Sequence, residues 1–332
     1  MWCCMLELHL FGTPQVLQDS QDLTADVGAK SLALISFLAI SNSPVPRQKL
    51  AGTFWSDKTE EASRYRLRHS LWDLNRLLPK EFIQSNDGNC WLQVDKNVRI
   101  DVLEFQQGTQ ALGVGTPNYA ISSDQIAPLT LLKNLYRGEF LECIIVRGAP
   151  LFDEWLLVER EQLQVLYLDV LWNLARTQQL VQDYASAAQT LAQLIALDPL
   201  HERGYRALMV VHFYRGDHAA AVRVYKQCAM NLAAELGVAP SPGTEQVREL
   251  IAKGTLASVQ SELELASKLV QEQRYREAWS VCATIEALTA DPITRSKVAL
   301  LRAEIAIAQG RNAESLGLVQ AARQAVSSLF SS

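Results

Sequence analysis

The sequence lacks any apolar run that approaches the roughly 18–20 residues needed by a membrane-spanning helix. Its first residues, MWCCMLELHLFG, have neither the basic segment nor the small-residue cleavage site of a signal peptide. Of the 332 residues, 48% are hydrophobic and 20% charged, which is ordinary for a globular chain long enough for two or three domains. We therefore expect a cytoplasmic protein that has no membrane partner.

Cysteine is scarce, and the sequence contains no CxxC pair. The six cysteines are scattered along the chain: Cys3, Cys4, Cys90, Cys143, Cys228 and Cys282. This pattern is typical of reduced thiols and argues against a disulfide framework. The adjacent Cys3 and Cys4 have no second pair to complete a tetrahedral zinc site, so we expect no metal site.

Signatures of catalysis and nucleotide binding are also missing. The sequence contains no GxxxxGK[ST], HExxH, GxSxG or GxGxxG. Its five histidines show no ligand spacing, and a separation of six positions does not place His212 and His218 on one helical face. Asp-Pro pairs at 198–199 and 291–292 are typical of helix ends. We therefore expect no enzymatic activity and no cofactor.

Positive charge is in overall deficit, with a formal net charge of -5 for the chain and 11 Lys+Arg against 13 Asp+Glu in residues 1–105. Yet residues 62–78, ASRYRLRHSLWDLNRLL, contain four arginines and a histidine. Nucleic-acid binding through this stretch would rest on a local patch, with little long-range steering. The alternative is a basic helix face that is simply solvated.

The first hundred residues alternate between strand and helix patterns. Leu6, Leu8 and Leu10 alternate with polar residues, and the run resumes at 15–17 after a break, which predicts a small antiparallel hairpin or meander. Three helical patterns follow: residues 30–40, residues 47–55 after an interruption by Pro44 and Pro46, and residues 62–78, which are preceded by Glu60-Glu61 and closed by Pro79. Strand-like runs then flank Asn86-Asp87-Gly88, a strong hairpin signal. This order resembles an OmpR/PhoB-type winged helix-turn-helix, whose third helix enters the major groove and whose hairpin is the wing.

The third helix separates its apolar side from its charged side. At about 100° per residue, the four leucines at 67, 71, 74 and 78 fall within a sector roughly 60° wide, which predicts a core stripe. The other side carries Tyr65, His69, Arg76 and, less centrally, Arg66 and Asp73, while Arg64 and Arg68 lie on one flank. This layout suits base contacts from the outward face and phosphate contacts from the edges. Trp72 also points away from the leucines, and we expect it to pack under the wing.

From about residue 125 the pattern is nearly all helical and repetitive. Asp183-Tyr184-Ala185 and Asp217-His218-Ala219 lie 34 residues apart, which is the tetratricopeptide period, and two looser copies begin near Tyr275 and Asn312. Such hairpins cannot bury their apolar faces alone, so they stack into a superhelix. The expected fold is thus mainly α, with an N-terminal winged helix and an all-α tetratricopeptide-like superhelix.

Longer stretches resemble the SARP-type transcriptional regulators, in which a winged helix precedes a bacterial transcriptional activator domain. The similar segments are LHLFGTPQV, LAGTFWSD, LRHSLWDLNRLL, RIDVLEF, YRGEFL, FDEWLLVEREQL, ALDPLHERGYRALM and AELGVAPSPGTEQVRELI. They cover about residues 5–252 in the family's order. This sequence departs from the family at Asp73 and Asn75, where family members often carry arginine. It also has only one basic residue, Lys30, before the first helix.

The resemblance implies a sequence-specific regulator that binds direct repeats in promoter DNA and recruits RNA polymerase. Because the local basic patch gives one copy only modest affinity, we expect a homodimer on DNA. The resemblance also implies DNA reading by the helix that carries Arg64, Tyr65, Arg66, Arg68 and His69, and the outward position of Arg76 on the same helix adds it to the expected DNA-binding residues. The expected division is a winged helix at 1–105, a junction at 106–128, the activator domain at 129–252 and further tetratricopeptide-like hairpins at 253–332. We expect partial helix near 102–112. Two alternatives stay open: an interaction scaffold that has lost DNA binding, and a regulator whose repeats sense a ligand.

Overall fold

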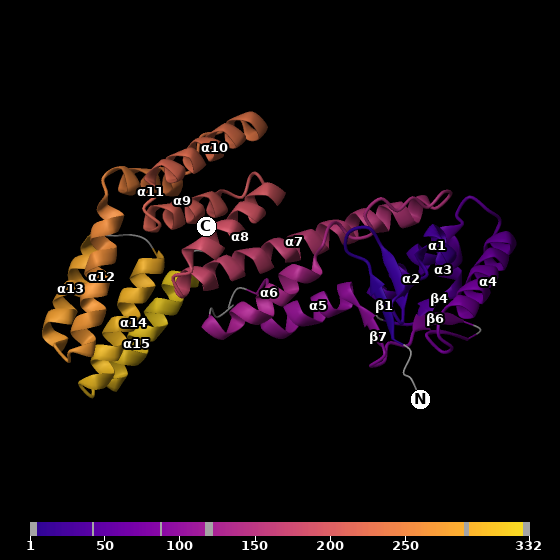
Figure 1. The fold of residues 1–332 in the computed structure, drawn as a ribbon, viewed down its shortest axis with the longest axis horizontal. Helices are drawn as coiled ribbons and strands as arrows, with labels where there is room; N and C mark the ends of the chain where they lie inside the picture. The colour runs from indigo at the N-terminus through magenta and orange to yellow at the C-terminus, as the bar shows by residue number, and fades with distance from the viewer. Residues whose placement is uncertain (1–4, 42, 87, 117–121, 289–291, 328–332) are drawn as a thin grey trace. The chain divides into compact units, whose positions relative to one another are not determined.

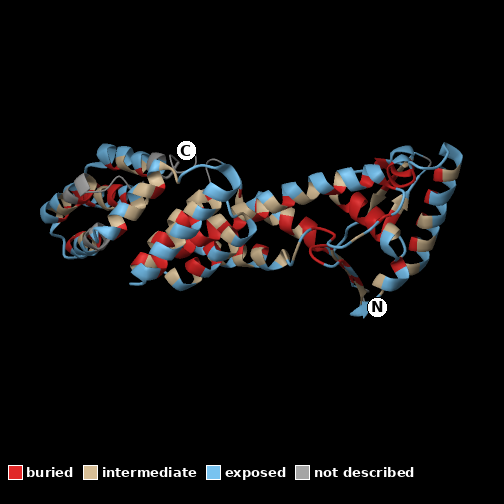
Figure 2. Cartoon of the chain, turned by 90° about the horizontal axis from the view of Figure 1, so that it is seen from above, coloured by how far each residue is buried: buried red, intermediate tan, exposed pale blue. Residues whose placement is uncertain are grey.

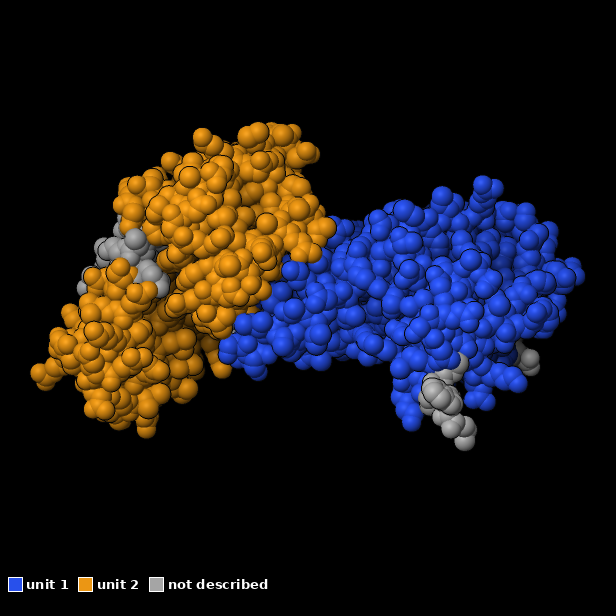
Figure 3. All heavy atoms as spheres, in the orientation of Figure 1, with its two compact units in different colours: residues 1–115, 122–174 blue, residues 116–121, 175–332 orange. Residues whose placement is uncertain are grey.

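The structure is a computed structural model that describes residues 5–41, 43–86, 88–116, 122–288 and 292–327. The chain forms two compact units, which are coloured separately in Figure 3: residues 1–115 with 122–174, and residues 116–121 with 175–332. Cys3 and Cys4 lie outside the described residues. Within the part of the chain that is described, no helix has the length and apolar content to cross a membrane.

The first unit begins with a four-stranded sheet in the order β3-β2-β1-β7. Strands β1 (Leu6–His9) and β2 (Gln15–Gln18) form the predicted antiparallel hairpin, and the short β3 (Gln21–Asp22) extends it. The leucines of the predicted alternation are buried, and both Leu6 and Leu8 are 0% exposed. Strand β7 (Val98–Ile100) pairs with β1 in parallel, which adds one parallel pair to the predicted antiparallel strands.

The three predicted helices are confirmed as α2 (Ala29–Ser41), α3 (Arg47–Phe54) and α4 (Glu60–Leu77). A single extra turn, α1 (Thr24–Val27), precedes them. Helix α2 is apolar on most of its surface because it is surrounded, with eight of its thirteen residues buried. In Figure 1 these helices gather at one end of the unit, beside β1 and β7.

A second small sheet follows α4, in the order β4-β6-β5. Strands β5 (Ile83–Ser85) and β6 (Asn89–Leu92) are the predicted wing hairpin, and they pair antiparallel. Strand β4 (Val45–Pro46) adds an edge to the wing through Val45 and Cys90. Pro46 lies in this edge strand, where proline is tolerated because the outer N–H of an edge strand needs no partner.

The segment after β7 is helical, as predicted. Helix α5 (Asp101–Leu112) covers the expected range and ends at Gly113, which adopts a left-handed conformation. After residues 117–121, which lie outside the described part, a turn of 3-10 helix η1 (Ser123–Gln125) leads into α6 (Ile126–Leu135) and the long α7 (Pro150–Leu180). Helices α5, α6 and most of α7 belong to the same compact unit as the winged helix.

The second unit consists of helices, and residues 160–230 contain no strand, as predicted. After the end of α7 its helices are α8 (Tyr184–Leu197), α9 (Glu202–Tyr214), α10 (His218–Leu236), α11 (Pro242–Ala252), α12 (Thr255–Gln271), α13 (Tyr275–Leu288), α14 (Pro292–Ala308) and α15 (Asn312–Ser327). Neighbouring helices pack through buried sides that face one another (Figure 2). This is the tetratricopeptide-like stacking that the 34-residue period predicted.

One turn geometry recurs in four of these helical hairpins. The residue two positions before the second helix has a positive φ in each case: Gln182, Gly216, Gln273 and Gly310. The next N–H then donates to a carbonyl five residues back, from Asp183 to Gln178 at 2.9 Å and from Asp217 to His212 at 2.9 Å. This bond satisfies a carbonyl that the helix end leaves open. The repeat is therefore preserved in its turns even where its side chains differ.

Candidate DNA-binding helix and its support

Helix α4 is defined at both ends by local chemistry. The Thr59 side chain caps it by accepting a hydrogen bond from the Ala62 N–H, and Glu60 and Glu61 stand in its first turn, where negative charge is favourable. The helix ends at Leu77 with Leu78 as its C-cap, because the following proline cannot continue it. The predicted leucine stripe is confirmed, since residues 67, 71, 74 and 78 are 1%, 5%, 1% and 5% exposed.

All six predicted DNA-binding side chains lie on α4 and are exposed to solvent: Arg64, Tyr65, Arg66, Arg68, His69 and Arg76. Three of them have neighbours on the same helix. Arg64 pairs with Glu60, His69 Nδ1 lies 2.8 Å from Asp73 Oδ2, and the Arg76 guanidinium lies 4.9 Å from the centre of the Trp72 ring. Exposed pairs of this kind contribute about 0–1 kcal/mol, so a phosphate or a base can replace them at small cost.

Trp72 does not pack under the wing, so that prediction is wrong. Its side chain is 56% exposed on the outward side of α4. The leucine stripe already fills the space between α4 and the rest of the winged helix, and the wing meets α4 through β5. A tryptophan about 130° away from that stripe has no route into the core.

The wing and the start of α2 provide few additional cations. At the wing tip the Asn86 side chain accepts hydrogen bonds from the N–H groups of Gly88 and Asn89, and Arg47 Nη1 donates to the Asn86 carbonyl at 3.4 Å. Lys30 is committed to the fold, because its Nζ donates to the carbonyls of Phe54 at 3.0 Å and Arg147 at 2.9 Å. Burial lowers the pKa of Lys30, although Asp57 opposes this effect.

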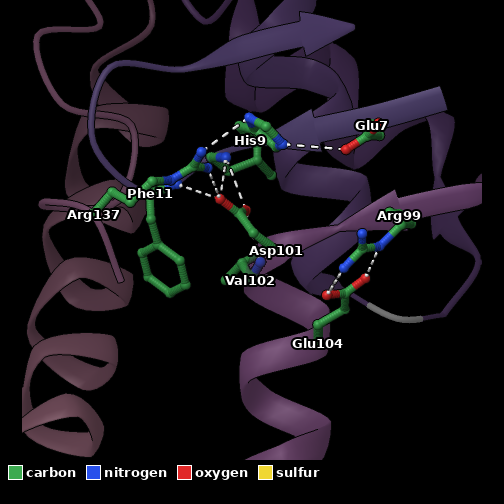
Figure 4. A network of polar contacts seen from close by, with 9 residues as sticks. Glu7, His9, Phe11, Arg99, Asp101, Val102, Glu104 and Arg137 are labelled. Atoms are coloured by element: carbon green, nitrogen blue, oxygen red, sulfur yellow. Dashed lines mark hydrogen bonds and ion pairs between the residues drawn. The ribbon is translucent and has the colours of Figure 1, made fainter. Parts of the chain in front are cut away.

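A buried carboxylate joins the winged helix to the helices that follow it (Figure 4). Asp101, 5% exposed, accepts hydrogen bonds from the N–H groups of Leu10 (2.8 Å), Phe11 (3.2 Å) and Val102 (2.8 Å). Arg137 Nη2 donates to Asp101 Oδ2 at 2.8 Å, and its Nη1 lies 3.0 Å from His9 Nδ1. Burial raises the pKa of Asp101. The hydrogen bonds from Leu10, Phe11 and Arg137 lower it and so partly offset the effect of burial.

The backbone of the YRGEFL segment pairs with the loop after β1. Gly12 donates to the Glu139 carbonyl at 2.9 Å, and Leu141 donates to the Leu10 carbonyl at 2.8 Å. A side chain at position 138 would not fit, since its Cβ would lie 2.9 Å from the Cα of Gly12. Arg160 then holds the segment from α7 by donating to the carbonyls of Phe140 and Leu141 at 2.8 and 2.6 Å.

Aromatic side chains complete this connection. Tyr136 stacks on Tyr167 with ring centres 4.0 Å apart, and it also packs at 4.7 Å against Phe11. Phe152 of α7 packs on Phe54 at 5.0 Å, and Trp155 packs on Phe37 at 4.6 Å. The segments YRGEFL and FDEWLLVEREQL therefore hold the winged helix against α5–α7. The sequence identifies these segments only as family features and does not predict this role, although the Arg and Gly flanked by aromatic residues in YRGEF are a signal for it.

Two later landmark segments meet in the same way inside the second unit. Glu202, at the start of α9, accepts hydrogen bonds from the Ser241 N–H at 2.7 Å and the Ser241 hydroxyl at 2.6 Å, and from Thr244. His201 caps α9 through Nδ1, which accepts from the Gly204 N–H at 3.0 Å. Burial lowers the pKa of His201. These contacts anchor α11 on α9.

The geometry defines a winged helix with an exposed basic third helix, followed by tetratricopeptide-like helices. Comparison with known proteins agrees with this class. Residues 105–252 match the bacterial transcriptional activator domain. Regulatory protein AfsR of Streptomyces griseus is 22% identical over 249 residues, which cover 74% of this chain and 24% of AfsR. The chain thus spans about a quarter of the length of that relative.

A solved structure shares the fold. EmbR of Mycobacterium tuberculosis, solved in complex with a low-affinity phosphopeptide, superposes with a TM-score of 0.59 and 20% sequence identity, and the match covers 79% of this chain and 72% of that one. The chain therefore contains a bacterial transcriptional activator domain, and its resemblance to SARP-type transcription regulators is confirmed.

Proposed function

We propose that the chain is a sequence-specific DNA-binding transcription regulator. In this proposal it binds direct repeats in double-stranded promoter DNA and contacts RNA polymerase as an activator. The observation that carries the proposal is the exposed basic face of α4, opposite a fully buried leucine stripe. A winged helix offers this face of its third helix to the major groove.

Each arginine has a proposed role that follows from its position on α4. Arg66 and His69, with Tyr65, contact base edges, and Arg76 extends the contact towards the end of the helix. Arg64 and Arg68 lie nearer the core edge, so they contact phosphates. The functional division that we propose is 1–105 for DNA binding, 106–128 as junction, 129–252 for activation and 253–332 as further repeats.

The test is competition binding with variants of the full chain, on a site selected from random duplex DNA and on its single-base mutants. Arg66→Ala should cost about 1–3 kcal/mol and relax preference at one base pair. Arg68→Ala should weaken binding to all sequences nearly equally and reduce the salt slope by about one. Arg276→Ala, on the exposed side of α13, is the matched control and should bind as the original chain does. Identical specificity and salt profiles for the first two variants would contradict these roles.

Assembly on DNA is part of the proposal. Direct repeats place two copies head to tail, unlike the two-fold contact of a palindrome reader. The net negative charge of residues 1–105 limits the affinity of one copy, so a homodimer on DNA is expected. Sedimentation with a two-site duplex should show two chains bound, and one chain at saturation would count against it.

The alternative is a protein-interaction scaffold with lost DNA binding. Exposed apolar residues on α7 favour a protein contact there: Leu157 is 65% exposed, Val158 51% and Val165 54%. A scaffold would select no sequence from random DNA and would show no steep salt dependence. A regulator keeps both properties and uses the same α7 surface for its protein partner.

A further inference from the structure

The outward face of α4 carries a stripe with the same spacing as its core stripe. Tyr65, His69, Trp72 and Arg76 follow one another at intervals of four, three and four residues, as the buried leucines at 67, 71, 74 and 78 do. The two stripes are offset by two residues, which corresponds to about 200° around the helix. The outward stripe therefore lies directly opposite the core, at the part of α4 that reaches deepest into a groove.

Trp72 is the unusual member of this stripe. Of the tryptophans that the structure describes, it alone is exposed, with 56% of its surface in solvent. It is also held in place: the Arg76 guanidinium lies 4.9 Å from its ring centre, and the His69 ring lies 6.2 Å away. His69 is held in turn by Asp73 at 2.8 Å. A large apolar ring is thus presented to solvent in the middle of a basic helix face.

The major groove offers one apolar group to such a ring, the 5-methyl group of thymine. An arginine stacked on the ring suits a guanine in the next base pair, because two N–H groups of its guanidinium can donate to O6 and N7 of the guanine. Stacking also limits the conformational freedom of the arginine side chain. The four arginines of α4 favour a polyanionic partner over an apolar protein surface. We propose that Trp72 reads a thymine through its 5-methyl group and holds Arg76 against an adjacent guanine. This inference rests on the proposed function and adds a specificity-determining residue to it.

The test removes the methyl group and the ring separately. A duplex site is first selected with the full chain from random DNA. Each thymine of the selected site is then replaced by deoxyuridine, one at a time, and binding is measured for the original chain, Trp72→Ala and Trp72→Phe. For the original chain, one replacement should reduce affinity about fourfold, the equivalent of one buried methyl group. Trp72→Ala should bind thymine and deoxyuridine at that position equally well, while Trp72→Phe keeps part of the difference.

Two controls make the result specific to Trp72. Tyr65→Ala removes another exposed ring of the same stripe, 61% exposed, and should keep the full thymine effect. Replacing the neighbouring guanine by 7-deazaguanine should weaken the original chain and leave Arg76→Ala unaffected. Melting temperatures should be unchanged in all these variants, because each side chain is exposed.

The possible failures are distinguishable. If the original chain selects no sequence, the proposed function fails and this inference fails with it. If it selects a site but no thymine depends on Trp72, the function survives and the inference is overturned. If Trp72→Ala binds DNA normally and only loses self-association in sedimentation, Trp72 is a protein contact and the inference is equally overturned.

Discussion

The connection between the winged helix and α5–α7 depends on Asp101, and Asp101→Asn tests it. The carboxylate accepts from three backbone N–H groups and from Arg137. An asparagine offers one acceptor oxygen and turns an NH2 group towards donors that need an acceptor. Because the Leu10 N–H reaches both carboxylate oxygens, one backbone N–H group, that of Phe11 or of Val102, would then be left without a partner in a buried site, at about 1–3 kcal/mol. Arg137 adds little, because it is 43% exposed and can turn to water.

We therefore expect Asp101→Asn to destabilise the first unit by about 1–3 kcal/mol. Because a chain with two units need not unfold in one step, the assay is hydrogen exchange followed by mass spectrometry, read peptide by peptide. Exchange should accelerate in peptides covering residues 5–18 and 98–112 and stay unchanged in peptides covering 264–286. Glu104→Gln, which loosens only the exposed pair with Arg99, is the matched control and should cost at most about 1 kcal/mol. Unchanged exchange in Asp101→Asn would refute the reasoning.

Three further sets of substitutions test separate parts of the fold. Gln182 and Gln273 adopt left-handed backbone conformations, which disfavour a residue with a side chain by roughly 1–2 kcal/mol. Replacing either residue by Gly should therefore raise the melting temperature of the second unit, by the equivalent of up to about 1 kcal/mol. Gly216→Gln should lower that temperature, and no change in any of the three would contradict the turn geometry. Leu71→Ala should cost about 2–5 kcal/mol in thermal melting, since it deletes core volume, and a cost below about 1 kcal/mol would mean that the stripe is not core. Burial lowers the pKa of His201 from 6.5, so the stability given by its neutral ring is present above that pH and is lost as the pH falls through the lowered value. His201→Asn keeps a capping acceptor and cannot titrate, so its melting temperature should fall less on acidification, and an equal fall in both proteins would refute this.

Features that depend on neighbouring residues were readable from the sequence. The leucine spacing of α4 predicted its buried side, and Pro79 predicted its end, because both follow from the geometry of a single helix. The 34-residue distance between Asp183 and Asp217 predicted two helix starts, and each aspartate caps the helix that follows it. The wing hairpin was readable for the same reason, since its turn residues lie next to its strands.

Other features needed the tertiary structure, because they join residues far apart in the chain. Asp101 meets Leu10 across 91 residues, and Lys30 meets Arg147 across 117. The parallel pairing of β7 with β1 is likewise non-local. No periodicity reports such contacts, so the YRGEFL segment could be matched to a family but not given its role. Trp72 is the clearest case. Its sequence position placed it away from the leucines, but only the filled space under α4 decided that a residue of core type stays in solvent, on the face proposed to meet DNA.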